Sequence, residues 1–162
     1  MLALNIEEKI FKRMKLNKEK LIPYGFIKEN ESYHYNKNFM KDTFRADIYI
    51  DLNGNVKGKV YDLDIEEEYT NFRVEDSVGE FVNTVKEEYI KILKDIADHC
   101  FEKEYFIYKQ SNRIVKLIKE TYQVEPEFLW EKFPNHGVFR NVRSEKWFGI
   151  IMNIDKSKMI PK

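Results

Sequence analysis

The residues with the clearest chemical potential are three cations near the C-terminal end, Arg140, Arg143 and Lys146, on or beside a predicted tight turn between two strands. Long cationic side chains at such a turn extend into solvent. A basic β-hairpin can follow a phosphate backbone, and its affinity then falls as salt rises. Arg113 and Lys132 add positive charge in the same part of the chain. These five residues are the candidate nucleic-acid contacts, although hairpin turns are also charged for solubility alone.

Both tryptophans, Trp130 and Trp147, belong to the same segment, residues 129–154. Exposed aromatic rings beside cations can stack on nucleic-acid bases. Tryptophans in short strands are more commonly core residues, so both interpretations stay open.

The charge distribution also singles out the C-terminal part. The whole chain has 28 basic and 28 acidic residues, but residues 101–162 have 12 basic against 8 acidic ones. Such an asymmetry indicates either an anionic partner or a solvated face.

No arrangement typical of a catalytic, cofactor or metal site is visible in the sequence. The glycines never cluster as a phosphate-binding loop requires, and the three histidines lack zinc-ligand spacing. Cys100 falls on the apolar stripe of a predicted helix, which favours a core role. The acidic run from Asp62 to Glu68 lacks calcium-loop spacing and favours a charged edge strand. We expect no enzyme and no cofactor, although catalytic groups from distant segments can converge in space.

Composition predicts a folded protein. Of the 162 residues, 43% are hydrophobic and 15% aromatic, and the single cysteine excludes an internal disulfide. The sequence shows neither a basic leader followed by an apolar run nor an apolar stretch of about 18 residues. We expect a cytoplasmic protein with no membrane segment.

The N-terminal part predicts an antiparallel sheet. Residues 44–52 alternate between apolar and polar, and a return strand over residues 56–62 follows the turn at Asn53-Gly54. A two-residue loop would place lysines opposite isoleucines. A three-residue loop with Gly54 in the left-handed region pairs Ile50 with Val56 instead, so the parity of the pattern favours the longer turn.

Helices are predicted around this sheet. Asn5 with Glu8 and Ser77 with Glu80 are helix-capping patterns. The second opens the longest helix, whose apolar residues recur at three- and four-residue spacing as far as Cys100, and we expect it to cover the apolar face of the sheet. A further strand is expected around residues 68–74.

A second unit is predicted after a boundary near residue 104, giving domains over residues 1–104 and 105–162. Its helix spans residues 109–122, with a core face of Ile114, Leu117, Ile118 and Tyr122. Three short strands follow, over residues 128–131, 138–142 and 146–154. Segregated helices and antiparallel strands make the fold class α+β.

The segment LWEKFPNHGVFRNVRSEKWFGIIMNI resembles the MmcQ/YjbR family, and the resemblance covers about residues 106–160. Longer members carry an N-terminal extension like residues 1–104. The family pattern continues with further strands beyond Met159, whereas this sequence stops at Lys162, so the chain is either a fragment or has an incomplete C-terminal sheet. The matching residues are Trp130, Lys132, Pro134, Val138 to Arg140, and Lys146 to Phe148.

The resemblance implies a small CyaY-like unit of one helix and three strands, no cofactor, and DNA binding by likeness of fold alone. We therefore expect weak, non-specific binding of DNA or RNA through the basic hairpin. The alternative is a protein–protein interaction module with an exposed apolar sheet edge, and an unrecognised enzyme ranks third. The strand from Lys146 to Ile154 is apolar on both faces, which predicts cover from the N-terminal part or from a second copy of the chain.

Overall fold

The structure, a computed structural model, describes residues 5–152. The chain divides into two compact units, Met1–Lys103 and Glu104–Lys162, each of which is described by itself. Helices and antiparallel strands occur in both units, as the α+β class requires.

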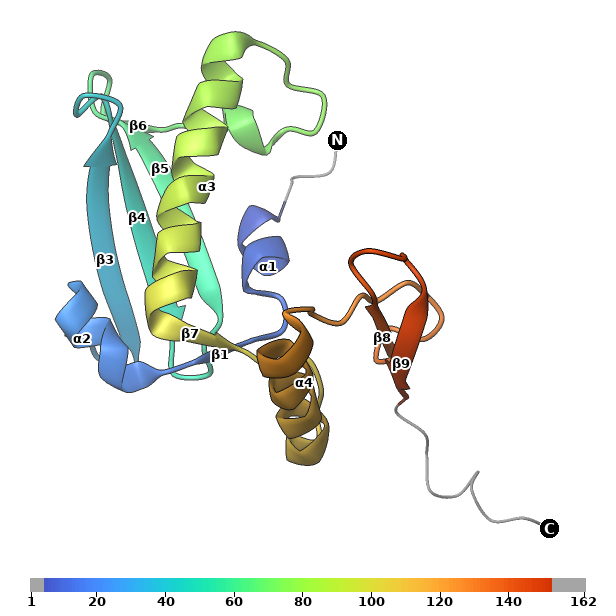
Figure 1. Ribbon diagram of the computed structural model, residues 1–162. Helices are drawn as coiled ribbons and strands as arrows, with labels where there is room; N and C mark the ends of the chain where they lie inside the picture. The colour runs from blue at the N-terminus through green and yellow to red at the C-terminus, as the bar shows by residue number, and fades with distance from the viewer. Residues whose placement is uncertain (1–4, 153–162) are drawn as a thin grey trace. The chain divides into compact units, whose positions relative to one another are not determined.

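The N-terminal unit is built on a five-stranded antiparallel sheet in the order β2-β3-β4-β5-β6 (Figure 1). A polar turn at Asn30 and Glu31 joins the first two strands, and Asn30 has a positive φ of 52°. The strands are β2 (Ile27–Glu29), β3 (Ser32–Phe39), β4 (Phe44–Asp51), β5 (Val56–Asp62) and β6 (Glu67–Glu68).

The turn between β4 and β5 confirms the parity prediction. Ile50 lies opposite Val56, and Gly54 has a φ of 88°. The turn is closed by hydrogen bonds from the Asp51 amide to the Asn55 carbonyl and from the Gly54 amide to the Asp51 carbonyl. The alternating apolar residues of β4 are all buried in this register, namely Phe44, Ala46, Ile48 and Ile50.

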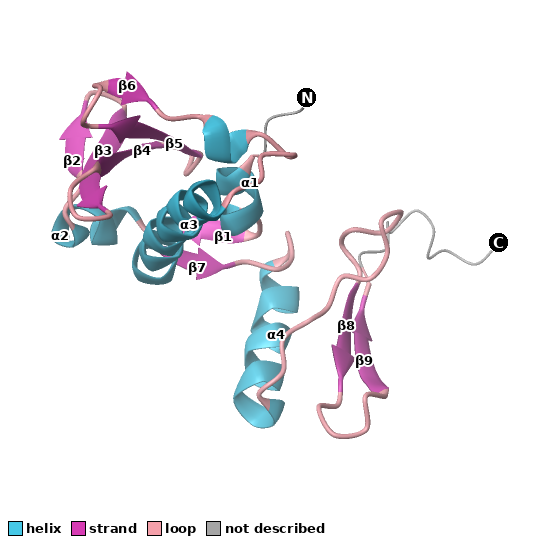
Figure 2. Ribbon diagram, turned by 90° about the horizontal axis from the view of Figure 1, so that it is seen from above, coloured by secondary structure: helices cyan, strands magenta, loops and turns pink. Residues whose placement is uncertain are grey.

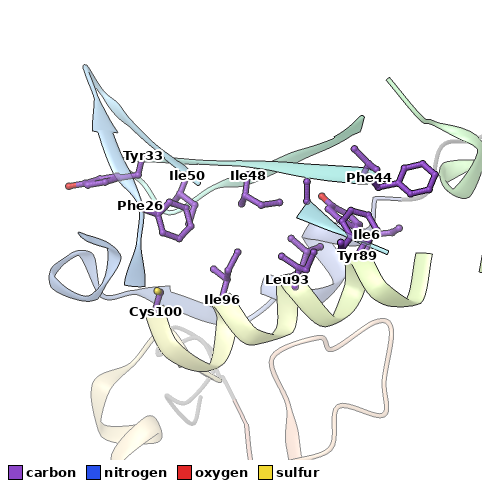
Figure 3. Packing of buried hydrophobic residues seen from close by; sticks show 14 of the residues in the cluster. Ile6, Phe26, Tyr33, Phe44, Ile48, Ile50, Tyr89, Leu93, Ile96 and Cys100 are labelled. Atoms are coloured by element: carbon purple, nitrogen blue, oxygen red, sulfur yellow. The ribbon is translucent and has the colours of Figure 1, made fainter. Parts of the chain in front are cut away.

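Helix α3 (Glu80–Cys100) covers one face of this sheet, as predicted (Figure 1). Figure 3 shows Leu93 and Ile96 of the helix directed towards Ile48 and Ile50 of β4, and all four are fully buried. Burial of each such side chain contributes about 1.5–3 kcal/mol. The predicted cap at Ser77 is wrong: α3 begins two residues later, with Gly79 at the N-cap position, and Val78 is 89% exposed.

Shorter elements close the remaining sides of the N-terminal core. Helix α1 (Ile6–Phe11) begins at the predicted cap, where the Asn5 side chain accepts a hydrogen bond from the Glu8 amide. A 3₁₀ turn, Lys18–Lys20, leads into α2 (Leu21–Tyr24). The sequence did not predict a two-stranded sheet between β1 (Met14–Leu16) and β7 (Phe101–Lys103), because neither three-residue strand shows a period (Figure 2).

The strand expected over residues 68–74 is wrong for most of its length. Strand β6 ends at Glu68, the Tyr69 amide makes one further bond to the Val60 carbonyl of β5, and a 3₁₀ turn, Asn71–Arg73, replaces the rest. The turn directs the Arg73 guanidinium onto the carboxylate of Glu7. The short, exposed Glu67–Glu68 strand is the charged sheet edge that the acidic run predicts.

The C-terminal unit consists of helix α4 (Lys109–Tyr122) and the hairpin of β8 (Gly137–Arg140) and β9 (Trp147–Ile151), seen in Figure 2. The bounds of α4 match the prediction. The strand predicted over residues 128–131 does not form. It is reduced to an isolated bridge between Glu127 and Val138.

The core of the C-terminal unit is small, formed by the buried side chains of Phe106, Val115, Val124 and Phe139. Val115, which the predicted core face left out, is the buried residue of α4. Three members of the predicted core face are exposed, Ile114 by 50%, Leu117 by 63% and Tyr122 by 60%. The predicted core face differs from the buried face because α4 has more apolar residues than the hairpin covers.

Across residues 5–152, no helix combines the length and the apolar character that a membrane span needs.

Candidate functional site

The turn between β8 and β9 is held in one conformation by its own polar groups. The Asn141 carboxamide oxygen accepts hydrogen bonds from the Arg143 amide at 2.9 Å and the Ser144 amide at 3.0 Å. The Asn141 amide donates to the Lys146 carbonyl, and the Glu145 amide donates to the Asn141 carbonyl, both at 2.9 Å. Glu145 adopts the left-handed conformation with a φ of 56°. The side chains of residues 142–146 are therefore presented on a fixed backbone.

Arg140 braces this turn. Its Nε donates to the carboxylate of Glu127, at 3.2 Å from Oε1, and its Nη1 donates to the Glu145 carbonyl at 3.0 Å. The guanidinium thus links the segment before β8 to the far side of the turn. Because its charge is neutralised by Glu127, Arg140 has less capacity for a phosphate than its sequence position suggested.

Arg143 and Lys146 are different. Both side chains are exposed on the turn. No acidic side chain among residues 5–152 forms an ion pair with either of them. Both are therefore available for an anion in solution.

The remaining two candidates lie elsewhere in the C-terminal unit. Lys132 is exposed in the loop between α4 and β8. Arg113 is exposed on α4, nine residues before Tyr122, whose ring lies 5.2 Å from that of Phe148 in β9. Nine residues span about 14 Å of helix, which separates Arg113 from the end of α4 that approaches β9. The fold therefore groups Arg140, Arg143 and Lys146, and sets Arg113 apart.

The two tryptophans lie together beside the cations. Trp130 and Trp147 meet edge to face with ring centroids 5.6 Å apart, and Trp147 is the register partner of Arg140. Trp147 is 52% exposed, and neither tryptophan belongs to the buried core. The core interpretation of these residues is therefore wrong. His136 and Phe133 extend the group, with their rings stacked at 5.0 Å.

The N-terminal unit holds a second polar feature, which the sequence did not reveal. Glu7 of α1 is buried and receives two hydrogen bonds from Arg73, at 2.7 and 3.0 Å, and one from the Tyr89 hydroxyl at 2.5 Å. Burial alone would raise the pKa of Glu7, but the bonds from Arg73 and Tyr89 outweigh it and lower that pKa. The partners are 66 and 82 residues away in the sequence, so no local spacing signals the group.

Glu7 and Arg73 line a cleft of about 900 Å³ between α1, β1 and the β4–β5 hairpin. The Glu7 carboxylate, the Arg73 guanidinium and the Tyr89 hydroxyl bond to one another, and Arg73 also donates to the Gly58 carbonyl at 2.8 Å. Since these buried polar groups are mutually satisfied, we interpret the group as a structural bridge between α1, β5 and α3.

Cys100 and His34 make contacts that are typical of residues with a structural role. Cys100 is fully buried, and burial raises the pKa of its thiol to about 11. His34 stacks on Tyr49 and lies 3.1 Å from the carboxylate of Asp47, which also accepts a bond from Arg45. Within residues 5–152, no three His, Cys, Asp or Glu side chains are grouped to hold a metal ion.

Comparison with known proteins gives one partial similarity. A stretch of 46 residues, 28% of this chain, is 41% identical to "Uncharacterized protein YyaQ" of Bacillus subtilis (strain 168). No family model matches the chain, and no solved structure matches it. The match covers 39% of the length of the Bacillus protein, so the chain is similar to part of a relative that is itself uncharacterised.

Proposed function

We propose that this chain is a non-enzymatic nucleic-acid-binding protein related to the MmcQ/YjbR family, and that the turn from Asn141 to Lys146 contacts the phosphate backbone. The proposed relationship rests on the aromatic and basic motif of residues 129–154 and on the partial similarity to the Bacillus protein. The activity is inferred from the chemistry of the turn.

The observation that carries the proposal is that two cations without an ion-pair partner among residues 5–152, Arg143 and Lys146, lie on a fixed backbone. The Asn141 side chain and the Arg140 brace hold the turn in place before any ligand arrives. A preorganised loop loses less conformational entropy on binding than a mobile one. Arg143 and Lys146 then supply charge that no described acidic residue neutralises.

Trp147 gives the site a second mode of contact. Its ring is half exposed and follows Lys146 directly in the sequence. Stacking of a base on an aromatic side chain contributes about 1–3 kcal/mol and tolerates any sequence, because every base has a π-face. Together with two phosphate contacts this predicts weak binding without base specificity, and a preference for single strands, whose bases are free to stack.

The test is the salt dependence of binding to a short single-stranded oligonucleotide, measured by fluorescence anisotropy. Each neutralised phosphate contributes about 0.7 to the logarithmic salt slope for a single strand. The double substitution Arg143→Ala with Lys146→Ala should therefore reduce the slope by about 1.4. Trp147→Ala should weaken binding at every salt concentration and leave the slope unchanged.

A matched control removes the same charge elsewhere. Lys28→Ala with Lys94→Ala takes two exposed lysines from the N-terminal unit, on β2 and α3. We expect this variant to keep the wild-type salt slope. Equal losses in the two double variants would show that binding follows net charge and would remove the turn from the proposal.

A further inference from the structure

Within residues 5–152, no strand lies beside the outer edge of β9 in the C-terminal hairpin. The Val138 amide and carbonyl bond to Glu127, at 2.9 and 2.8 Å, so both point away from β9. Ile150 is the register partner of Val138. In an antiparallel pair, the partner of an outward-facing residue also faces outward, so the amide and carbonyl of Ile150 point away from β8. Among the described residues, nothing bonds to that edge of β9.

The side chains along this edge are apolar and half exposed. Trp147 is 52% exposed, Phe148 and Ile150 are each 45% exposed, and Met152 is 50% exposed. No charged residue or proline occurs from Trp147 to Met152. Asn153 and Ile154, the last two residues of the predicted strand, lie outside the described residues.

The five-stranded sheet of the N-terminal unit has edge strands that are protected from pairing with another chain. Its edge strands are β2, with Lys28 and Glu29, and β6, with Glu67 and Glu68. Short, charged edges of this kind discourage pairing with another chain. β9 has five residues and no charge, so its edge lacks that protection.

We propose that β9 pairs with β9 of a second copy of the chain, antiparallel and across a two-fold axis at Ile150. The two Ile150 residues then face each other and exchange their outward amide and carbonyl bonds. The same register places Phe148 opposite Met152 of the second copy, and Gly149 opposite Ile151. Every opposed pair from 148 to 152 is apolar, which makes this edge self-complementary.

The exposed area sets the strength of the association. A large side chain that is half exposed offers roughly 100 Å², because aromatic residues bury about 150–250 Å² in full. The four side chains of two copies therefore bury about 800 Å², before the backbone is added. This is below the roughly 1,200 Å² at which stable, specific interfaces begin and falls among weak, transient ones, so we expect a weak dimer with a dissociation constant of about 1–100 μM.

Sedimentation equilibrium of the full chain, at about 5–500 μM, tests the proposal. We expect a reversible dimer for the wild type. Ile150→Lys places like charges opposite each other and should raise the dissociation constant at least about tenfold, as should Ile150→Glu. An equimolar mixture of these two variants should recover the dimer. The matched control is Val142→Lys, an equally drastic change at a side chain that is 78% exposed and off the edge, which should leave the dimer intact.

A cysteine variant keeps the test decisive if the charged variants fold poorly. Residues opposed in a hydrogen-bonded antiparallel pair have Cα atoms about 5.5 Å apart, within disulfide range. Ile150→Cys should therefore form an intermolecular disulfide under mild oxidation, whereas Val142→Cys should not. A wild type that stays monomeric throughout, a dimer that Ile150→Lys leaves unchanged, or a mixture of charged variants that stays monomeric would each overturn the proposal.

Discussion

Gly58 of β5 is the position at which the smallest substitution should do the most damage. A Cβ atom there would lie 1.8 Å from the Tyr89 hydroxyl and 3.1 Å from both Glu7 Oε1 and Ile48 Cδ1. Tyr89 is fully buried and donates its hydrogen bond to Glu7, so the ring has no space into which it can retreat. Gly58→Ala must therefore displace Tyr89 or the strand.

The size of the effect follows from two costs and one smaller compensation. Overpacking of a filled core costs about 1–3 kcal/mol. Loss of the hydrogen bond from Tyr89 to the charged Glu7 costs about 1.5–3 kcal/mol. Alanine lowers the conformational entropy of the unfolded chain, which offsets about 0.4–1 kcal/mol of this cost. We expect a net loss of about 2–5 kcal/mol, and a fall in Tm of at least about 10 °C for a unit of this size.

The assay is urea unfolding followed by far-UV circular dichroism, with tryptophan fluorescence recorded in parallel. Both tryptophans lie in the C-terminal unit, so their fluorescence follows that unit while most of the dichroism follows the other. The matched control is Gly149→Ala, whose Cβ meets Phe139 at an ordinary 3.6 Å and should change stability little.

A double-substitution cycle separates steric conflict from other causes. Tyr89→Phe removes the hydroxyl that an alanine at 58 would strike, so Gly58→Ala should cost less in the Tyr89→Phe background. We expect a coupling free energy of about 1–3 kcal/mol. A change below about 0.5 kcal/mol for Gly58→Ala, or a cost unaffected by Tyr89→Phe, would refute the reasoning.

Three further predictions concern single residues. Gly54→Ala should lose about 1 kcal/mol or more in urea unfolding, because φ is 88° and the new Cβ would lie 3.2 Å from that of Leu16; an unchanged midpoint would contradict this. The folded pKa of Glu7 is lowered, so its contribution to stability is complete above the ordinary value of 4.5 and is lost as pH falls through the folded pKa. Glu7→Gln should therefore flatten the acid limb of the stability profile, and a limb as steep as in the wild type would count against the buried pair with Arg73. Cys100, buried and with its thiol pKa raised to about 11, should resist a thiol reagent at neutral pH until the protein unfolds, so rapid labelling of the folded chain would show that the site opens.

Local patterns predicted the elements whose causes are themselves local. The β4–β5 register followed from side-chain parity, since a two-residue loop would have placed lysines opposite isoleucines. The bounds of α4 followed from the period of its apolar residues. The Asn5 cap depends on a contact three residues away.

The missed features depend on distant partners. Arg73 leaves the expected strand because it reaches Glu7, 66 residues earlier. The sheet of β1 and β7 pairs residues that are 85 apart at Leu16 and Phe101 and 89 apart at Met14 and Lys103, which no local window of sequence can detect. Ile114 and Leu117 fit a core stripe by period, yet the C-terminal hairpin is too small to cover them.

The candidate site was also predictable only where its causes are local. Its residue types and its place on a turn were visible in the sequence, as was the proximity of Arg140, Arg143 and Lys146. The ion pair between Arg140 and Glu127 was not visible in the sequence. It depends on the isolated bridge between Glu127 and Val138, which no periodic pattern signals. The exposure of Trp147 was also unpredictable, since it reflects how little of the hairpin the small core covers.

The central claim is that the turn from Asn141 to Lys146 contacts nucleic acid, and NMR titration of isotope-labelled protein with a short oligonucleotide tests it most directly. We expect the largest amide shift changes at Arg143, Lys146 and Trp147, together with the indole signals of Trp130 and Trp147. These changes should diminish as salt is added. Shift changes confined to the N-terminal unit, or none at low salt, would contradict the account.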